Sequence, residues 1–457
     1  MNRFLIILLA IALAGALIFS GCPQPAPTTT PTQTTAPTTT AAPTQQPKEL
    51  KIGATLNLTD VALGELPQAR WYQLYAKLIN DQGGWKLGGD TYKINMIIYD
   101  DQGDPIKEKN NLEKLVLQDG VKFILNGSST PGVDIEITEP NKVIILENDL
   151  SDVISDPAVQ YAYQGNGMYF ARGLGYVLAV HFAQKGVKTY VSLKTDTELG
   201  HYATMLGDLC WQTQGVKMVG EVYFALDTSD FGPIATKVMS YKPDLVDMNY
   251  CSNIVQCYSA LHDAGYKGAL LPSFADQALV DNLVTQCGKE FIEGGECFYQ
   301  DPRGYQTDPE MLAYMDAYVE EYGNFGTEGI LFSGTWFLLK DAIENTQSVD
   351  VEVIKAYLDN SDHAVMTLTT YTQLMARPDL GNYRTICGNP VDLVGRIHDG
   401  KLETFASVGP KTHYLSAILA YGQVDIYKEY WEEYGYPTFP DEPSAINFSD
   451  LGITGHD

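Results

Sequence analysis

The residue patterns that would support catalysis are missing from this chain. Neither Gly-x-Ser-x-Gly nor His-Glu-x-x-His occurs, so the usual hydrolase and zinc-protease signatures are absent. His181, His201 and His262 fall in predicted helices or their first turns, where packing and surface roles are the simpler interpretation. The cysteines form no Cys-x-x-Cys pair and Gly165-Asn-Gly167 lacks the third glycine of a dinucleotide fingerprint, so we expect no metal and no nucleotide cofactor. The sequence therefore predicts a protein that is not an enzyme.

A hydroxyl-rich loop offers the clearest binding chemistry. Residues 127–132 read Gly-Ser-Ser-Thr-Pro-Gly, directly before a helix that we predict to begin at Val133. Backbone N–H groups at a helix N-terminus attract anions, and nearby hydroxyls add further donors. Ser129 and Thr130 are therefore candidate binding residues for an anionic group, and simple capping of the helix is the alternative.

The charge balance narrows the class of partner. The chain carries 57 acidic and 30 basic residues, which gives a formal net charge of −27. Such acidity disfavours nucleic acid and anionic membrane surfaces as partners. Asp100, Asp101 and Asp104 lack the spacing of a calcium loop, and Asp104 is expected to cap a helix.

The first 47 residues predict export and anchoring. A basic Arg3 followed by an apolar run over residues 4–19 is typical of a secretory signal, because the run is short for a membrane span. The small residues before Cys22 resemble the lipobox of prokaryotic lipoproteins. We expect residues 1–21 to be removed and Cys22 to carry lipid, with an uncleaved anchor as the alternative. Residues 22–47 then form a Pro/Thr-rich stalk that cannot bury enough surface to fold.

Six cysteines remain once Cys22 is set aside. An even number outside the cytoplasm permits up to three disulfides, with many possible connectivities. Cys287 and Cys297 bracket a helix-to-strand connection, so we prefer this pair.

The rest of the chain predicts two α/β lobes. About 410 residues follow the stalk, which is more than one hydrophobic core usually serves. Apolar strands alternate with helices of about ten to fifteen residues in two consecutive series, which predicts parallel sheets covered on both faces. Such sheets bind ligands at the carboxyl ends of their strands, so we expect the site in the cleft between two doubly wound lobes that close about a hinge.

The lobe boundaries follow from these two series. We assign lobe 1 to residues 48–165, with residues of about 300–345 returning to it, and lobe 2 to residues 166–299. Residues 346–457 are less periodic and are expected to supply crossovers and lobe-completing segments.

Several segments carry a family resemblance. Residues 51–59 (KIGATLNLT), 79–84 (INDQGG) and 99–105 (YDDQGDP) resemble, in order and spacing, the branched-chain-amino-acid-binding protein family. Residues 120–127 (GVKFILNG) and 264–268 (AGYKG) fit later landmarks of that family. The resemblance implies a type I periplasmic-binding fold with a multi-strand hinge. It also implies a small-molecule ligand and an ABC permease as partners.

The resemblance also places the binding loops of lobe 1. The family loop that meets the ligand carboxylate corresponds here to the loop of Ser129 and Thr130. The next family loop corresponds to Asp149, Leu150 and Ser151, with Ser151 at a threonine position. Glu147 and Asp149 place acid where the family is neutral, so this loop departs from the pattern.

Lobe 2 departs as well. Where the family presents a tyrosine before a glycine, this chain has Leu199 before Gly200, with Tyr202 nearby. The carboxylate that holds the ligand ammonium is replaced by Asn253, which removes the charge and disfavours ordinary branched-chain amino acids.

Two acids and two aromatics complete the candidate site. Asp149 or Asp276 could replace the missing carboxylate, although Asp276 could equally cap a helix. Trp71 and Tyr202 could wall the cleft, with packing in the core as the alternative for each.

These expectations converge on one function. We predict an extracytoplasmic lipoprotein, held to the outer face of the cell membrane only by its lipid. In this prediction it captures a small polar, amino-acid-like solute for an ABC importer. A ligand-sensing receptor domain of the same fold is an alternative, and a surface-anchored hydrolase is a more remote one.

Overall fold

The computed structural model describes residues 46–59, 65–127, 131–148, 152–165, 168–249, 251–272, 274–275, 277–299, 301–323, 325, 330, 333–442 and 444–457. Chain contacts divide the protein into Met1–Thr44 and Gln45–Asp457, and only the second unit is described below. The predicted signal peptide and Cys22 lie outside the described residues. Over the described ranges, no helix combines the length and apolarity that crossing a bilayer requires.

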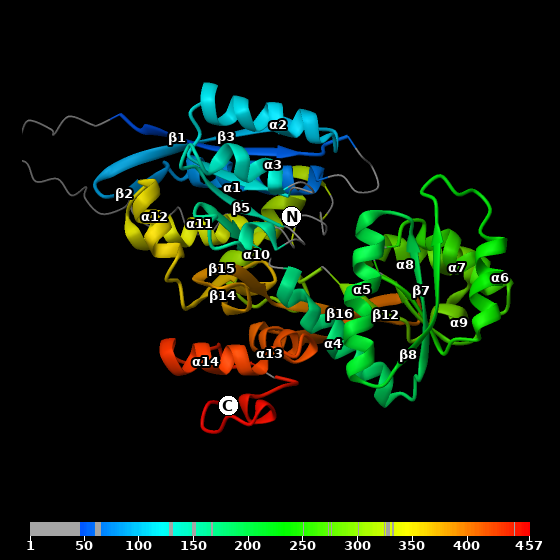
Figure 1. Ribbon diagram of the computed structural model, residues 1–457. Coiled ribbons are helices and arrows are strands. Elements are labelled where there is room, and N and C mark those ends of the chain that lie inside the picture. Colours follow the sequence, from blue (N-terminus) through cyan, green and yellow to red (C-terminus); the bar gives the residue numbers. More distant parts are fainter. Residues whose placement is uncertain are drawn as a thin grey trace, which may run out of the picture. The chain divides into compact units, whose positions relative to one another are not determined.

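The largest sheet has nine strands (Figure 1). In spatial order they are β13 (Ala364–Thr367), β14 (Thr370–Arg377), β15 (Asn382–Pro390), β6 (Ala162–Gln164), β5 (Ile144–Glu147), β4 (Phe123–Asn126), β1 (Lys48–Leu56), β3 (Asp90–Asp100) and β2 (Trp85–Leu87). The strands from β15 to β3 are parallel, whereas β2, β13 and β14 add antiparallel edges. We call this sheet and the helices on it lobe 1.

Alternating residues of the strands face two helical layers. Phe123 and Leu125 of β4 join the core formed with the first layer, whereas Ile124 joins the core formed with the second. This alternation is the period-two pattern of a strand covered on both faces. The first layer consists of α1 (Leu66–Asp81), α10 (Pro309–Tyr322), α11 (Ser333–Thr346) and α12 (Val351–Leu358). The second layer consists of α2 (Pro105–Glu113), its continuation η1 (Lys114–Gln118) and α3 (Pro131–Thr138).

The predicted cap of α2 is confirmed. The side chain of Asp104 accepts hydrogen bonds from the backbone N–H groups of Ile106 and Lys107, at 2.8 and 3.3 Å. Pro105 follows at the first helical position, where its missing N–H costs nothing. The Asp100–Asp104 segment therefore forms a turn and a helix cap, as expected from its sequence.

Lobe 2 is built on a second, four-stranded parallel sheet. Its spatial order is β10 (Ala269–Pro272), β9 (Leu245–Met248), β7 (Thr189–Thr195) and β8 (Lys217–Phe224). Its helices are α4 (Met168–Gln184), α5 (Glu198–Thr213), α6 (Gly232–Tyr241), α7 (Ile254–Asp263), α8 (Gln277–Cys287) and the short α9 (Lys289–Ile292). The apolar periodicity of the sequence predicts helices over residues 168–184 and 198–213 and a strand over residues 217–224, and these bounds coincide with α4, α5 and β8.

A third sheet and the C-terminal helices complete the chain. The sheet runs in the order β11 (Phe274–Ala275), β12 (Glu296–Tyr299), β16 (Asp392–His398) and β17 (Lys401–Val408). The helices α13 (Pro410–Ala420) and α14 (Val424–Tyr434) and the final turn η4 (Phe448–Leu451) follow. Tyr414, Tyr427 and Trp431 form an aromatic core among them.

Three connections link the large sheet to the other two. They run between β6 and β7, between β12 and β13, and between β15 and β16. Several chain crossings between α/β lobes are the multi-strand hinge that we predicted. The strands β13, β14 and β15 show that residues 364–390 also belong to the large sheet.

The expected Cys287–Cys297 disulfide is wrong for this structure. None of the six cysteines from Cys210 to Cys387 forms a disulfide within the described part of the chain, and all six are buried. The sulfur of Cys287 lies 3.9 Å from the hydroxyl of Ser259, whereas that of Cys297 lies 3.9 Å from the carbonyl of Gly395. The two thiols therefore contact different residues. Whether two cysteines form a disulfide depends on the directions of their side chains and not on their closeness in sequence.

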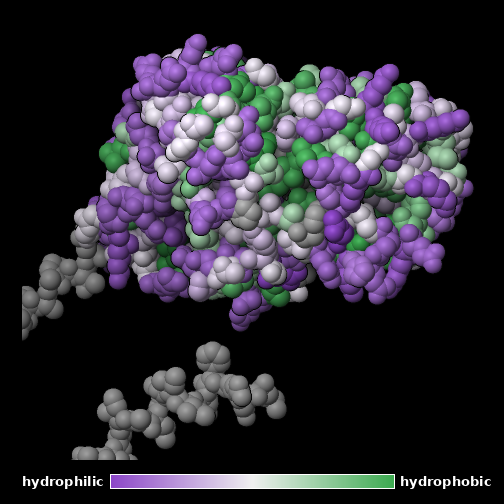
Figure 2. All heavy atoms as spheres, turned by 90° about the horizontal axis from the view of Figure 1, so that it is seen from below, coloured by the Kyte–Doolittle hydropathy of each residue, from purple (hydrophilic) through white to green (hydrophobic). Residues whose placement is uncertain are grey.

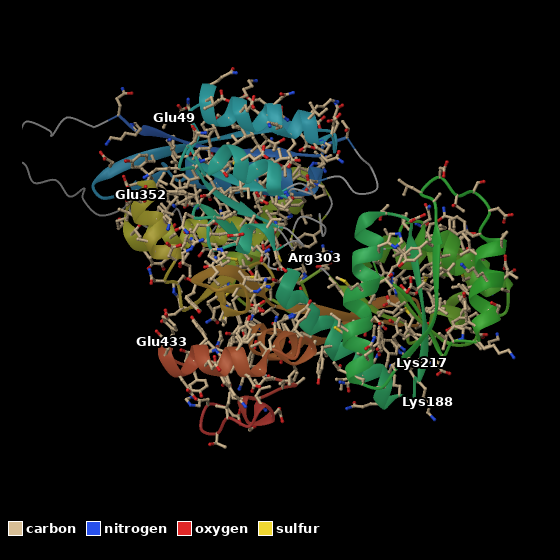
Figure 3. The ribbon with its side chains drawn as sticks, viewed as in Figure 1. Glu49, Lys188, Lys217, Arg303, Glu352 and Glu433 are labelled. Carbon is tan, nitrogen blue, oxygen red and sulfur yellow. The ribbon has the colours of Figure 1, made fainter. Side chains whose placement is uncertain are left out.

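Polar side chains dominate the face shown in Figure 2. The charged residues labelled in Figure 3 come from many elements, and two of them, Arg303 and Glu352, form ion pairs. Glu352, for example, lies 2.8 Å from Lys142 in an exposed ion pair. Exposed pairs of this kind contribute little to stability.

Candidate functional site

Four neighbouring strands of lobe 1 end at one edge of the large sheet. The strands β6, β5, β4 and β1 are adjacent and parallel, so the residues after them lie along the same edge. These residues are Asn57, Gly127, Asn148 and Gly165. The carboxyl edge of a parallel sheet is where α/β proteins bind ligands, so we regard this strand edge as the candidate site.

Three buried carboxyl groups lie behind the strand edge. Asp101, Glu108 and Asp134 are at most 6% exposed. Asn126, the last residue of β4, donates from its side-chain amide to Asp134 at 2.9 Å and to Glu108 at 3.4 Å. Thr55 donates its hydroxyl to Asp101 at 3.0 Å. Acids from three separate segments, the turn after β3, α2 and α3, thus gather at the end of β1 and β4.

Glu65 stands in front of this acidic group, just before α1. Its Oε2 atom accepts a hydrogen bond of 2.8 Å from the backbone N–H of Asn57. Burial, followed by repulsion from Asp101, Glu108 and Asp134, raises the pKa of Glu65 to about 8, against the lowering effect of that hydrogen bond. At neutral pH the Glu65 carboxyl group is therefore largely protonated.

Gln68 lies one helical turn further along α1 and is 1% exposed. Its Nε2 atom donates to the Tyr72 hydroxyl at 2.8 Å, and that hydroxyl lies 2.6 Å from the hydroxyl of Thr335. Its Oε1 atom has no hydrogen-bond partner within the described residues. Among the residues that the structure describes, the Gln68 amide is thus held at its nitrogen only.

Gly127 permits Glu65 and Gln68 to approach the strand edge. A Cβ atom added at Gly127 would overlap the Oε1 atom of Glu65 and would lie 3.1 Å from the Oε1 atom of Gln68. Two side-chain oxygens therefore converge on the backbone after β4. Only glycine leaves the space that this arrangement needs.

Asn148 adds a further polar group at the end of β5. Its backbone N–H donates to the carbonyl of Asn126 at 3.3 Å, which fixes it beside β4. Both polar atoms of its side chain are buried and lack a hydrogen-bond partner among the residues described. Glu147, immediately before it, is fully buried.

Lobe 2 contributes residues at the ends of β7 and β9. Asn253 precedes α7 in a left-handed conformation with φ 56°, and its side-chain amide donates to the carbonyl of Leu226 at 3.4 Å. The backbone N–H of Ser252 donates to the Thr195 hydroxyl at 2.8 Å. The amide of Asn253 is neutral, so it cannot act as a counter-ion for an ammonium group.

Of the site residues predicted from the sequence, Trp71, Tyr202 and Asn253 belong to the described part of the structure, and the others do not. Trp71 is 1% exposed and stacks on Tyr318 in the lobe 1 core, with ring centroids 4.1 Å apart. The backbone of Tyr202 lies in α5, and its side chain is outside the described part of the structure. The remaining predicted residues lie outside the described residues: Ser129, Thr130, Asp149, Leu150, Ser151 and Asp276.

Sequence reasoning missed Glu65 and Gln68. Both stand at the start of the helix that the periodicity of residues 67–81 predicts, where an acid or amide normally suggests only capping. Their approach to Gly127 depends on how α1 packs on the sheet, and no local pattern reports that packing.

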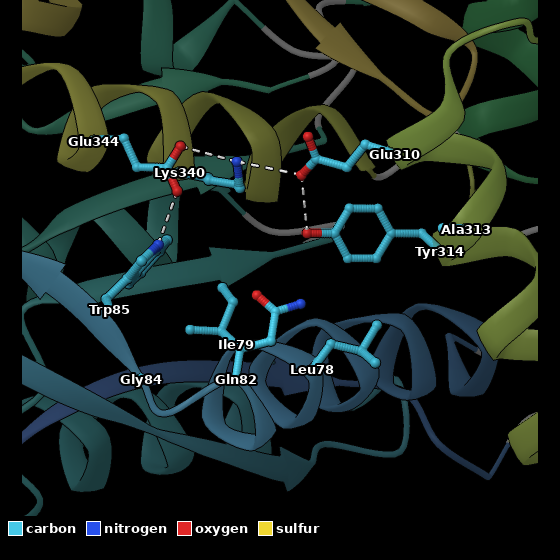
Figure 4. Close-up of a pocket in the computed structure, with 10 residues that line it drawn as sticks. All are labelled: Leu78, Ile79, Gln82, Gly84, Trp85, Glu310, Ala313, Tyr314, Lys340 and Glu344. Carbon is cyan, nitrogen blue, oxygen red and sulfur yellow. Dashed lines mark hydrogen bonds and ion pairs between the residues drawn. The ribbon is translucent and has the colours of Figure 1, made fainter. Parts of the chain in front are cut away.

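A separate cavity of about 380 Å³ lies between α1, β2, α10 and α11 of lobe 1 (Figure 4). Its charged groups already pair with one another. Glu344 accepts hydrogen bonds of 2.9 Å from both Trp85 and Lys340, and Lys340 also lies 3.6 Å from Glu310. The strand edge, where acceptors of Gln68 and Asn148 have no partner among the described residues, is therefore the stronger candidate site.

Comparison with known proteins identifies the family. The profile of the periplasmic binding protein family matches residues 49–376, and a search of curated proteins finds no match. The leucine-binding protein LivK of Thermotoga maritima is 16% identical, with a TM-score of 0.62 over 79% of this chain and 99% of that one.

Two further solved structures have the same fold. An ABC transporter substrate-binding protein from Sphaerobacter thermophilus is 17% identical, with a TM-score of 0.64 over 79% of this chain and 98% of that one. A solute-binding protein of an ABC transporter from Rhodopseudomonas palustris BisB5, in complex with 3,4-dihydroxybenzoic acid, is 16% identical, with a TM-score of 0.63 over the same shares. The chain therefore belongs to the periplasmic binding protein family and has the type I fold of ABC-transporter solute-binding proteins.

Proposed function

We propose that this protein captures a small polar solute between its two lobes and delivers it to an ABC permease. The observation that carries the proposal is the family match across residues 49–376 together with open polar groups at the strand edge of lobe 1. In α/β sheets this edge is the usual ligand position. The three crossings between sheets supply a hinge about which the lobes close over the solute.

The class of solute follows only in part from the relatives. One relative is named for leucine and another holds 3,4-dihydroxybenzoic acid, so the fold accepts both amino acids and aromatic acids. For this chain we propose a small organic solute with several hydrogen-bonding groups, since Glu65, Gln68 and Asn148 offer polar atoms at the edge.

We further propose that the mature protein begins at Cys22 and is held to the outer face of the cell membrane by lipid on that residue. This proposal rests on the lipobox-like residues before Cys22 and on the Pro/Thr-rich segment that follows. Mass spectrometry of the N-terminal peptide tests it. A C22A variant should leave the membrane fraction, and retention of C22A in that fraction would argue for an uncleaved anchor.

Solute binding is tested on the purified mature chain. Small molecules released on denaturation should be identified by mass spectrometry, and the recovered solute should then bind with one-to-one stoichiometry in isothermal titration. Binding should also raise the midpoint of thermal unfolding, because a ligand that binds only the folded state stabilises it. If no solute is released and no solute in a broad metabolite panel binds, the proposed function is wrong.

A further inference from the structure

The charge at the lobe 1 strand edge is opposite to that needed by a carboxylate ligand. Asp101, Glu108 and Asp134 lie buried behind Gly127 and repel negative charge at the position of Glu65. A ligand carboxylate placed at this edge would meet the same repulsion. A positive group would instead be attracted, because low polarity around buried charges strengthens their field.

Gln68 gives an independent indication that the edge receives a hydrogen-bond donor. Its buried Oε1 atom lies beside Gly127 next to Glu65, without a hydrogen-bond partner among the described residues. Buried acceptors are nearly always satisfied by protein, water or ligand. A donor supplied by the solute would satisfy this oxygen and the neighbouring carboxylate together.

We infer that lobe 1 binds the cationic end of the solute, an ammonium, amidinium or guanidinium group, on the side-chain oxygens of Glu65 and Gln68 beside Gly127. This inference rests on the proposed solute-binding function and adds the charge class of the solute. Each of these groups carries N–H donors together with positive charge. A metal ion fits less well, because no group of three or more His, Cys, Asp or Glu in the described ranges is arranged to hold one.

The neutral Asn253 in lobe 2 agrees with this polarity. The family resemblance places a carboxylate for the ligand ammonium at this position, yet Asn253 has an amide that donates to Leu226. Acid is therefore present at the lobe 1 edge and absent at position 253. The positive end of the solute accordingly faces lobe 1.

Binding of a cation should release a proton. The charged groups that act on Glu65 are Asp101, Glu108 and Asp134, with the phenol of Tyr72 also near. With a pKa of about 8, the Glu65 carboxyl group is protonated in about nine of ten molecules at pH 7. A cation favours the ionised form, so the proton leaves Glu65 for the buffer as the ion pair forms.

The test uses the mature chain and two sets of probes. Putrescine, agmatine and choline are cations without a carboxylate, whereas benzoate and 3,4-dihydroxybenzoate are carboxylates without a cationic group. We expect at least one cation to bind in isothermal titration and neither carboxylate to do so. Titrations at pH 7 in buffers of different ionisation enthalpy should show release of about 0.9 proton for each cation bound.

Two variants separate the role of Glu65 from a general loss of folding. E65Q keeps the acceptor for Asn57 but cannot ionise, so cation affinity should fall at least tenfold and proton release should disappear. E113Q alters an exposed glutamate of α2 and should bind within twofold of the parent. Cation binding that is equal in E65Q and the parent would overturn the inference.

The remaining outcomes are also decisive. One-to-one binding of a carboxylate probe with no cation bound would overturn the cationic class while supporting solute binding. If no probe of either set binds in isothermal titration and no solute is released from the purified protein, the proposed function and the inference are both contradicted.

Discussion

Replacing Glu65 by glutamine should make the protein more stable at alkaline pH. The carboxyl group of Glu65 has an ordinary pKa of 4.5, which burial and the nearby carboxylates raise to about 8 in the folded state. In the unfolded chain these surroundings are gone. Between these two pKa values the folded state holds a proton that the unfolded state has released, so wild-type stability falls as pH rises through this window.

The size of the effect follows from the shift. At about 1.4 kcal/mol for each pKa unit, a change from 4.5 to about 8 corresponds to about 5 kcal/mol. Glu65 is only partly buried, and solvent screening lowers the effective value. We therefore expect E65Q to gain about 2–3 kcal/mol relative to wild type between pH 4.5 and pH 8.5.

Urea unfolding at these two pH values, followed by circular dichroism, measures the gain. The E113Q variant is the matched control, since Glu113 is exposed on the same lobe and its replacement should change the difference little. Parallel stability curves for E65Q and wild type over this range would refute the raised pKa. A stability of E65Q relative to wild type that falls from pH 4.5 to pH 8.5 would refute it as well, because the sign of the linkage would then be reversed.

Three further substitutions test the structure. G127A should displace the Glu65 carboxyl group and weaken solute binding at least tenfold in isothermal titration, and unchanged affinity would show that the edge is not the site. W71A should cost about 3–5 kcal/mol in urea unfolding, because it empties a filled aromatic core; a cost below about 1 kcal/mol would place Trp71 outside that core. R377L should lower the free energy of unfolding by about 3–5 kcal/mol in the same assay, because it leaves the buried carboxylate of Asp379 without its 2.8 Å ion pair. The double variant with D379N should recover part of this loss. No recovery would argue against the ion pair.

The C-terminal third contains strands whose place in the fold cannot be predicted from local sequence patterns. The sequence indicates a strand over residues 393–397 before the turn at Asp399, and β16 with that turn is present. The sequence does not predict that β13, β14 and β15 belong to the lobe 1 sheet. Their strand partners include β6, which lies some two hundred residues earlier in the chain, and such non-local pairing leaves no local periodicity to read.

The sequence by itself determined the elements whose signals are local. The apolar run of β1, the cap at Asp104 and the bounds of α4 all follow from hydrophobic period and turn chemistry within short windows. The same windows, taken in order, indicated the family. They could not determine the charge of the site.

Only the tertiary structure brought Glu65, Gln68 and Gly127 together in front of three buried carboxyl groups. The same dependence applies to Cys287 and Cys297, whose thiols point into different contacts. A pKa, an open acceptor or a disulfide depends on atoms a few ångströms apart in space, and those atoms come from segments separated by tens of residues. Local sequence fixes which helices and strands form, and their packing fixes the electrostatics of the site.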